Sequence, residues 1–169
     1  MKVKVEFNDQ GYLPDKYTKH TSASLRVDGK PAVSFPFEVD DLPKGTKTLA
    51  LYMKDFDSVP VCGFVWIHWL AANIDASHTS IPENMRLKPQ FDLVQGRNSN
   101  ASKFLSREIG PKIGYTGPQP PVGVHDYTLT VYALDTKLDL SEGYWLNEFL
   151  KKADNHILEK QNINLPVHS

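Results

Sequence analysis

The chain has 169 residues, of which 40% are hydrophobic and 23% are charged, a balance typical of one folded globular domain. Nineteen Lys and Arg against twenty Asp and Glu leave a net charge of -1, which gives no general attraction to nucleic acid or acidic membranes. The single cysteine, Cys62, excludes an intrachain disulfide framework and a thiolate-rich zinc site. We therefore expect a single domain over residues 1–169 with no nucleic-acid partner.

The N-terminal residues alternate charged and apolar side chains, and they lack the continuous apolar core of a signal peptide. No window approaches the ~18 apolar residues that a membrane span needs. These features predict a cytoplasmic protein without a membrane span.

The first half of the chain is expected to form antiparallel strands joined by short turns. Residues 3–7 alternate in the period-two pattern of a strand with one wet face. β-Branched and aromatic residues predict further strands over 24–27, 32–39 and 48–54. Residues 64–74 are continuously apolar, as in a strand covered on both faces, and we expect this to be the central strand.

The second half is expected to contain a long loop, a strand and a helix. Residues 73–121 are rich in Ser, Asn, Gly and Pro, which predicts a long irregular segment of the kind that often carries function. Residues 126–134 have a strong strand pattern. Apolar residues then recur at helical spacing over 146–157, which indicates an amphipathic helix of about four turns with a plausible start near Ser141. This order predicts a mainly β protein, an antiparallel β-sandwich with a C-terminal α-helix.

Two groups of polar residues lie at or within the predicted strands. Asp55 and Asp57 are two residues apart at a strand end and would point the same way in an extended chain, although a turn with two solvated acids also fits. His68 lies inside the most apolar strand, where an imidazole is costly unless a partner satisfies it. It is either a ligand-binding group or a neutral core histidine hydrogen-bonded to backbone.

A third group precedes the strand at 126–134. Pro118 and its neighbouring prolines stiffen the backbone, while Gly117 and Gly123 permit close approach of a ligand. His125 and Tyr127 then share one face of the strand.

These motifs resemble those of a known family. Asp55-x-Asp57 followed by Trp66-x-His68-Trp69, and Gly117-Pro118-x-Pro120-Pro121-x-Gly123-x-His125-x-Tyr127, resemble the two signatures of the phosphatidylethanolamine-binding proteins, and more closely their bacterial Raf-kinase-inhibitor-like branch. The resemblance spans roughly residues 31–158 and implies a β-sandwich with a pocket for phosphate or a phosphoryl headgroup. The pocket lining that it implies is Asp55, Asp57, His68, Gly117, Pro118, His125 and Tyr127.

Carboxylates beside an anion site require a compensating positive charge. We expect His68 or His125 to donate a hydrogen bond to Asp55 or Asp57 and to remain protonated near neutral pH, because a nearby carboxylate raises a histidine's pKa above its usual value of about 6.5. Tyr127 and the backbone amide near Gly117 are candidate neutral donors. We therefore expect anion binding to weaken as the pH rises past the pKa of the histidines.

Other functions remain open. Asp and His side chains also serve in hydrolases, by acid–base catalysis or by holding a metal, but neither a His-Glu-x-x-His helix nor a Gly-x-Ser-x-Gly elbow is present. We expect a binding protein without a cofactor. The resemblance also implies inhibition of a protein kinase or protease, with residues 75–112 as the partner-facing surface, or alternatively as a lid or a homodimer contact.

Two further expectations concern residues near these motifs. The aromatic residues Phe64, Trp66, Trp69 and Tyr132 recur at strand period and are expected to fill the core. Cys62 has no neighbouring His or Lys in the sequence to activate it, so we expect it to have a structural role.

Overall fold

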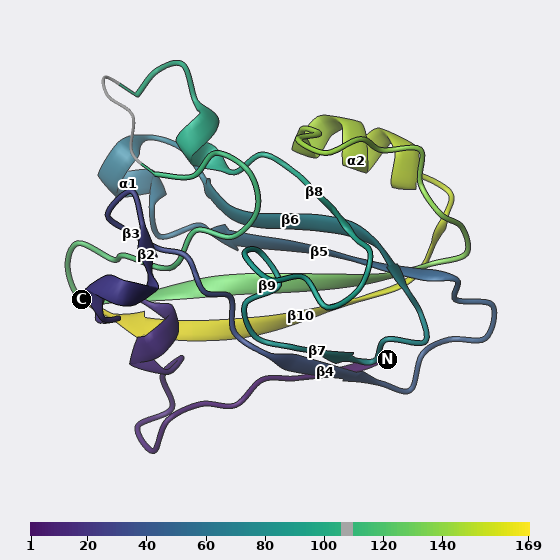
Figure 1. Ribbon diagram of the computed structural model, residues 1–169, viewed down its shortest axis with the longest axis horizontal. Helices are drawn as coiled ribbons and strands as arrows, with labels where there is room; N and C mark the ends of the chain where they lie inside the picture. Colours follow the sequence, from purple (N-terminus) through teal and green to yellow (C-terminus); the bar gives the residue numbers. More distant parts are fainter. Residues whose placement is uncertain (106–109) are drawn as a thin grey trace.

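The computed structural model describes residues 1–105 and 110–169, and it confirms the antiparallel β-sandwich. A five-stranded sheet in the order β10-β9-β5-β6-β8 faces a three-stranded sheet in the order β1-β4-β7, and β2 pairs with β3 (Figure 1). The strands are β1 Lys2–Lys4, β2 Arg26–Val27, β3 Lys30–Pro31, β4 Phe37–Asp40, β5 Thr48–Asp55, β6 Trp66–Asp75, β7 Ser80–Ile81, β8 Val94–Gln95, β9 Val124–Leu134 and β10 Ile157–His168. The helices are α1 Val59–Cys62 and α2 Leu146–Ala153, with 3-10 turns η1 Asp15–Tyr17, η2 Ala23–Leu25 and η3 Ser99–Ala101.

Strand β5 lies at the centre of the larger sheet and is covered on both faces. Leu49, Leu51 and Met53 belong to the apolar cluster between the two sheets, whereas Ala50 belongs to a second cluster beneath α2. The prediction that residues 64–74 form the central strand was therefore wrong by one position, because β6 lies beside β5. Both strands are apolar on both faces since both are interior to the sheet.

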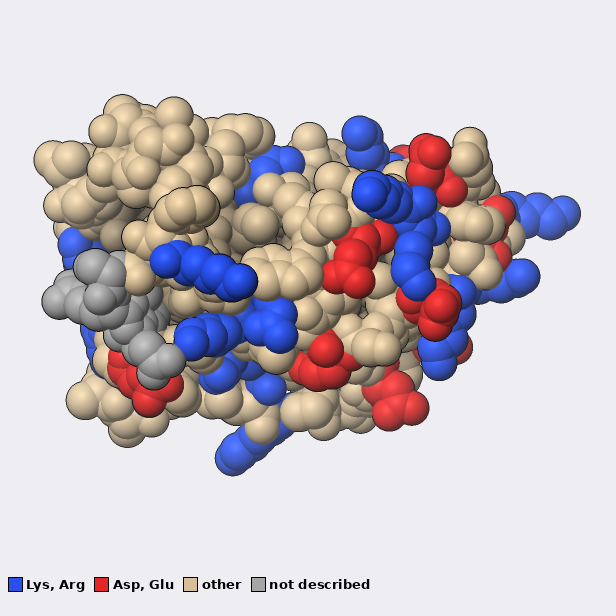
Figure 2. All heavy atoms as spheres, turned by 90° about the horizontal axis from the view of Figure 1, so that it is seen from above, with Lys and Arg blue, Asp and Glu red and all other residues tan. Residues whose placement is uncertain are grey.

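The helix near the C-terminus is shorter than predicted. It begins at Leu146, where Glu148 Oε2 accepts from the Trp145 backbone N–H at 2.7 Å, and Phe149 and Ala153 face the apolar cluster. Glu142, next to the predicted helix start at Ser141, instead accepts a hydrogen bond from the Gln95 N–H in β8. On the face seen in Figure 2, many Lys, Arg, Asp and Glu gather toward the right-hand end, on the side of α2, while a broad uncharged area lies at the upper left.

Strand β10 was not predicted. Ile157, expected to continue the helix, starts this strand, which pairs with β9 down to His168↔Val124. Asn155 has a φ of 64° and reverses the chain between helix and strand. A left-handed residue of this kind is a common way to end a helix, and Asn adopts it more readily than most residues.

The long segment between β6 and β9 is anchored at several points. Asn98 Nδ2 donates to the carbonyls of Pro111 and Gly114, each at 2.9 Å, and Asn100 Nδ2 donates to the Pro111 carbonyl at 3.0 Å. Part of the predicted partner-facing surface, residues 106–109, lies outside the described residues.

Candidate functional site

The antiparallel register of three strands brings distant polar residues together at one end of the larger sheet. Asp55, the last residue of β5, is opposite Trp66 in β6 and opposite Tyr127 in β9. His125 lies two residues before Tyr127 and so shares its face of the sheet. Three stretches of chain that are far apart in the sequence therefore meet around one carboxylate.

Asp55 and His125 form a buried hydrogen-bonded pair. His125 Nδ1 donates to Asp55 Oδ2 at 2.8 Å, and the Ser58 backbone N–H donates to Asp55 Oδ1 at 3.2 Å. The two side chains are 5% and 7% exposed, so water screens their interaction only weakly. The expected carboxylate–imidazole bond is therefore present between these two residues.

His68 is turned toward the site by an irregularity in the sheet. The pairing of β5 with β6 passes from Met53↔Trp69 to Lys54↔Ile67, which leaves His68 as an extra residue in a β-bulge. His68 Nδ1 donates to the Thr116 carbonyl at 2.7 Å, and the Thr116 N–H donates to the His68 carbonyl at 2.9 Å. Two hydrogen bonds thus fix the imidazole against the segment that precedes β9.

Burial lowers the pKa of His68 to about 4, although the Thr116 carbonyl and the Asp55 charge act in the opposite direction. The expectation that this imidazole remains protonated near neutral pH was therefore wrong. The cost of burying a charged ring exceeds the attraction of the nearby carboxylate, and that carboxylate is already bonded to His125.

Tyr127 and Gly117 complete the polar wall. The Tyr127 ring meets that of His68 edge to face, with centroids 4.9 Å apart, and burial beside Asp55 raises the pKa of Tyr127 far above its usual range. The Gly117 N–H donates to the Pro31 carbonyl at 2.9 Å, so it is not the ligand donor that the sequence suggested. A Cβ at Gly117 would lie 2.6 Å from both Pro31 Cβ and the Tyr17 carbonyl oxygen, which explains the need for glycine.

These residues line a cavity of about 210 Å³. Its polar lining includes Asp55, His68, His125 and Tyr127, and its apolar lining comes from α1, β6 and the proline-rich segment. The described residues that line it are Lys30, Asp55, Ser58, Val61, Cys62, Trp66, His68, Asn100, Thr116, Gly117, Gln119, Pro121, His125 and Tyr127. The cavity therefore combines a charged and hydrogen-bonding wall with an apolar rim.

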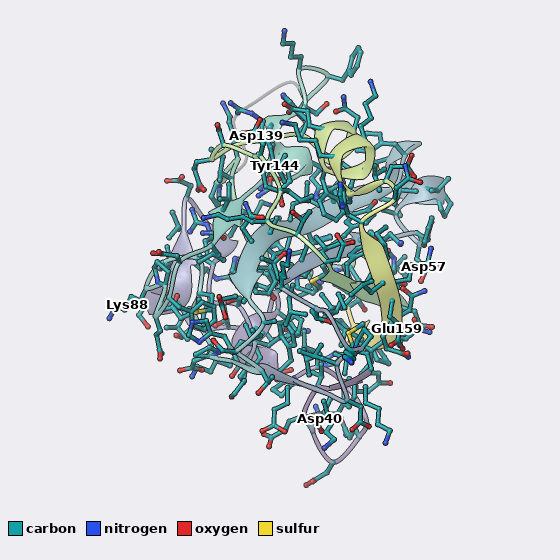
Figure 3. The ribbon with its side chains drawn as sticks, turned by 90° about the vertical axis from the view of Figure 1, so that its right-hand side faces the viewer. Asp40, Asp57, Lys88, Asp139, Tyr144 and Glu159 are labelled. Atoms are coloured by element: carbon teal, nitrogen blue, oxygen red, sulfur yellow. The ribbon has the colours of Figure 1, made fainter. Side chains whose placement is uncertain are left out.

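Two of the predicted lining residues lie elsewhere. Asp57 is exposed at the margin of the molecule (Figure 3), and its Oδ2 accepts from the Asp126 backbone N–H at 2.8 Å. It does not point the same way as Asp55, because β5 ends at Asp55 and the chain turns into α1. Pro118 is buried outside the cavity lining, and its carbonyl accepts from the Lys19 N–H.

Several lining residues were missed or misassigned. Trp66 and Phe64 were expected in the core, but Trp66 lines the cavity and Phe64, stacked on it at 5.5 Å, is 36% exposed. Trp69 and Tyr132 are buried as predicted. Cys62 is exposed at the cavity rim. Lys30 and Asn100 reach the cavity through long-range contacts that no local pattern of the sequence indicates.

Comparison with known proteins identifies the family. The family model of phosphatidylethanolamine-binding proteins matches residues 3–167. The chain belongs to this family. It is 47% identical to an uncharacterized protein, YxkA, of Bacillus subtilis over 98% of each chain, and 35% identical to a protein of Methanothermobacter thermautotrophicus over 90% of this chain and 87% of that one.

Solved structures of two relatives have the same fold. A putative phosphatidylethanolamine-binding protein homologue from Chlamydia trachomatis superposes with a TM-score of 0.75 at 27% identity, covering 94% of this chain and 90% of its own. YbcL of E. coli superposes with a TM-score of 0.75 at 23% identity over 99% and 98% of the two chains, and this likeness shows the fold alone. Small-ligand binding is the general property that family membership supports.

Two further features concern the part of the chain that the structure describes. No helix there is long and apolar enough to cross a bilayer. Among the same residues, no three His, Cys, Asp or Glu side chains lie close enough together to hold a metal ion.

Proposed function

We propose that this protein is a cytoplasmic binding protein that reversibly takes up a small phosphorylated or otherwise anionic ligand in the cavity beside Asp55. The observation that carries the proposal is the buried bond between His125 Nδ1 and Asp55 Oδ2. A histidine whose Nδ1 is held by a carboxylate presents its other nitrogen, Nε2, for a ligand.

The second nitrogen of His125 is available to an anion. Within residues 1–105 and 110–169, Nε2 makes no hydrogen bond to the protein, although the ring lines the cavity. When the ring is protonated, Nε2–H donates to the ligand and Asp55 compensates the positive charge from the opposite side. The carboxylate therefore assists anion binding instead of opposing it, because the imidazole stands between the two negative charges.

Other lining residues support the same function. Lys30 adds a cationic side chain to the cavity lining. The Tyr127 hydroxyl directs its hydrogen to the Asp55 carboxylate, so Tyr127 helps to fix the carboxylate behind His125. The apolar rim of Val61, Trp66 and Pro121 suits the uncharged part of a small organic phosphate.

Calorimetric titration with inorganic phosphate and with phosphoethanolamine tests the proposal. We expect both to bind, and we expect His125→Gln to weaken the binding, because the variant lacks the imidazole that Asp55 holds beside the cavity. Asp57→Asn, outside the cavity, should leave the affinity unchanged. Absence of binding, or an unchanged affinity in His125→Gln, would contradict the proposal.

Regulation of a protein kinase or protease, and a homodimeric state, stay predictions of the family resemblance. The hydrolase alternative uses the same Asp55–His125 pair as an acid–base unit. A screen with phosphatase and esterase substrates separates that alternative from binding: turnover that disappears in His125→Gln would favour the enzyme.

A further inference from the structure

We propose that the cavity selects an oxyanion that carries its own proton, such as hydrogen phosphate or the monoanion of a phosphate monoester, over sulfate and over phosphodiesters. The inference rests on the proposed function and specifies its ligand class. It follows from the opposite hydrogen-bonding roles of His68 and His125.

His68 has a fixed tautomer. A backbone carbonyl can only accept a hydrogen bond, so the 2.7 Å contact between His68 Nδ1 and the Thr116 carbonyl places a hydrogen on Nδ1. The reciprocal bond from the Thr116 N–H to the His68 carbonyl prevents the two segments from sliding apart. In a neutral ring the remaining nitrogen, Nε2, is then a lone-pair acceptor.

The neutral form is the one that this environment favours. The His68 residue is 6% exposed and lies against the Tyr127 ring, and the carboxylate that could stabilise a charge is bonded to His125. Burial lowers the pKa of His68 to about 4, in agreement with this geometry. The charged and titratable groups around the ring are Asp55, His125, Lys30 and Tyr127.

His68 Nε2 is an acceptor that lacks a donor. In the part of the chain that the structure describes, no protein group donates to it, although the ring lines the cavity. The atom is open to the cavity, so a ligand that fills the cavity without supplying a hydrogen leaves this acceptor unsatisfied, whereas a ligand that supplies one gains affinity. His125, by contrast, presents Nε2 as a donor when it is protonated, because its Nδ1 already donates to Asp55.

A ligand that satisfies both rings needs a negative oxygen for His125 and a hydroxyl for His68. Hydrogen phosphate has both on one phosphorus atom throughout the neutral pH range, and a phosphate monoester has both as its monoanion. Sulfate and phosphodiesters have no such hydroxyl, so one of their oxygen lone pairs would face the lone pair of His68. We expect a preference of about tenfold for the protonated oxyanion, from the cost of this unsatisfied pair.

Calorimetry on the full chain tests the inference with two pairs of ligands, the inorganic pair at neutral pH and the organic pair at about pH 5, where a phosphate monoester with a second pKa of about 6 is mostly the monoanion. Inorganic phosphate is compared with sulfate, which has similar size and shape. Phosphoethanolamine is compared with glycerophosphoethanolamine, a diester that represents a lipid headgroup. We expect phosphate and phosphoethanolamine to bind about tenfold more tightly than their partners.

His68→Phe keeps the ring volume and removes the acceptor. We expect it to abolish the preference, because phosphate loses its hydrogen-bond acceptor and sulfate no longer faces the lone pair of His68. Retained preference in this variant would overturn the role of His68. If the variant does not fold, the wild-type comparison decides alone.

The two claims fail in different ways. Equal, measurable affinity of the wild-type protein for phosphate and sulfate overturns the selection of a protonated oxyanion and leaves anion binding intact. Absence of binding for all four ligands overturns the proposed function and the selection with it.

Discussion

The two ends of the five-stranded sheet are built from the same strands, but one end is a closed apolar cluster and the other surrounds a cavity. At the α2 end, Ala50, Leu70 and Tyr132 pack under Phe149 in a closed apolar cluster. At the other end, β5, β6 and β9 contribute Asp55, His68 and His125, which surround a cavity. On the face seen in Figure 2, many charged residues also gather at the α2 end, and part of the opposite end is a broad uncharged area.

The two ends are stabilised by different kinds of interaction. The α2 end is stabilised by burial of apolar side chains, which needs no particular partner for each atom. The cavity end buries polar groups, and each of them must find a specific hydrogen-bond partner, as His125 does in Asp55 and His68 does in Thr116. The nitrogen atoms left over after this pairing are the groups that a ligand can use.

The largest expected effect is on the free energy of unfolding, and it tests whether the two ends are independent. Phe149 is 1% exposed, so Phe149→Ala should lower the free energy of unfolding by about 3–5 kcal/mol through lost burial and a residual cavity. Phosphate affinity, measured on the folded fraction at low temperature, should be unchanged. A parallel loss of affinity would show that the two ends are not independent.

A smaller effect is expected at Gly117, where stability and the site are linked. Gly117→Ala places a Cβ 2.6 Å from Pro31 Cβ and from the Tyr17 carbonyl oxygen, so the backbone must shift. We expect a destabilisation of about 1–3 kcal/mol in chemical denaturation, together with weaker phosphate binding. Gly123→Ala is the matched control, because the Cβ added there meets no atom within 4 Å. The φ of 70° at Gly123 still adds some backbone strain. Equal phosphate affinity in both variants would contradict the role of close packing in shaping the cavity.

The buried histidine predicts how stability changes with pH. Because the pKa of His68 is lowered to about 4 in the folded state, the unfolded chain binds a proton that the folded chain does not between about pH 6.5 and that value. Stability is therefore complete above about pH 6.5 and is lost as the pH falls, by about 2 kcal/mol at about pH 5.

Chemical denaturation at several pH values measures this contribution. His68→Phe should remove it, so the variant should lose less stability than the wild-type protein over the same range. Identical slopes in the two proteins would mean that His68 is not held neutral in the folded state.

The smallest effect compares two carboxylates of one motif. Asp55→Asn removes the charge behind His125, and we expect phosphate to bind about tenfold more weakly. Asp57→Asn changes an exposed acid outside the cavity and should alter the affinity by less than about twofold. Equal losses in the two variants would contradict the assignment of distinct roles.

Much of the fold could be predicted because local patterns agree with tertiary structure there. The alternation in β5 and the β-branched run in β9 indicate strands, and the structure contains both. Strand β10 could not be predicted in the same way. Ile157 continues the helical spacing of α2, but its pairing with β9, a long-range interaction, decides its conformation.

The sequence predicted which residues form the candidate site better than it predicted their hydrogen-bonding roles. Five of the seven predicted lining residues, Asp55, His68, Gly117, His125 and Tyr127, do line one cavity, while ligand binding by them stays a prediction. The sequence does not reveal that a β-bulge turns His68 toward Thr116, or that the Gly117 N–H is taken by Pro31. These contacts join segments distant in sequence, and they determine which nitrogen atoms donate and which accept.

Nuclear magnetic resonance of the imidazole nitrogens is the most direct test of the division of roles between the two histidines. In protein with 15N-labelled histidine at neutral pH and saturating phosphate, we expect His68 to be a neutral ring with hydrogen on Nδ1 alone and His125 to carry hydrogen on both nitrogens. A protonated His68, or a His125 that stays neutral in the phosphate complex, would contradict the account.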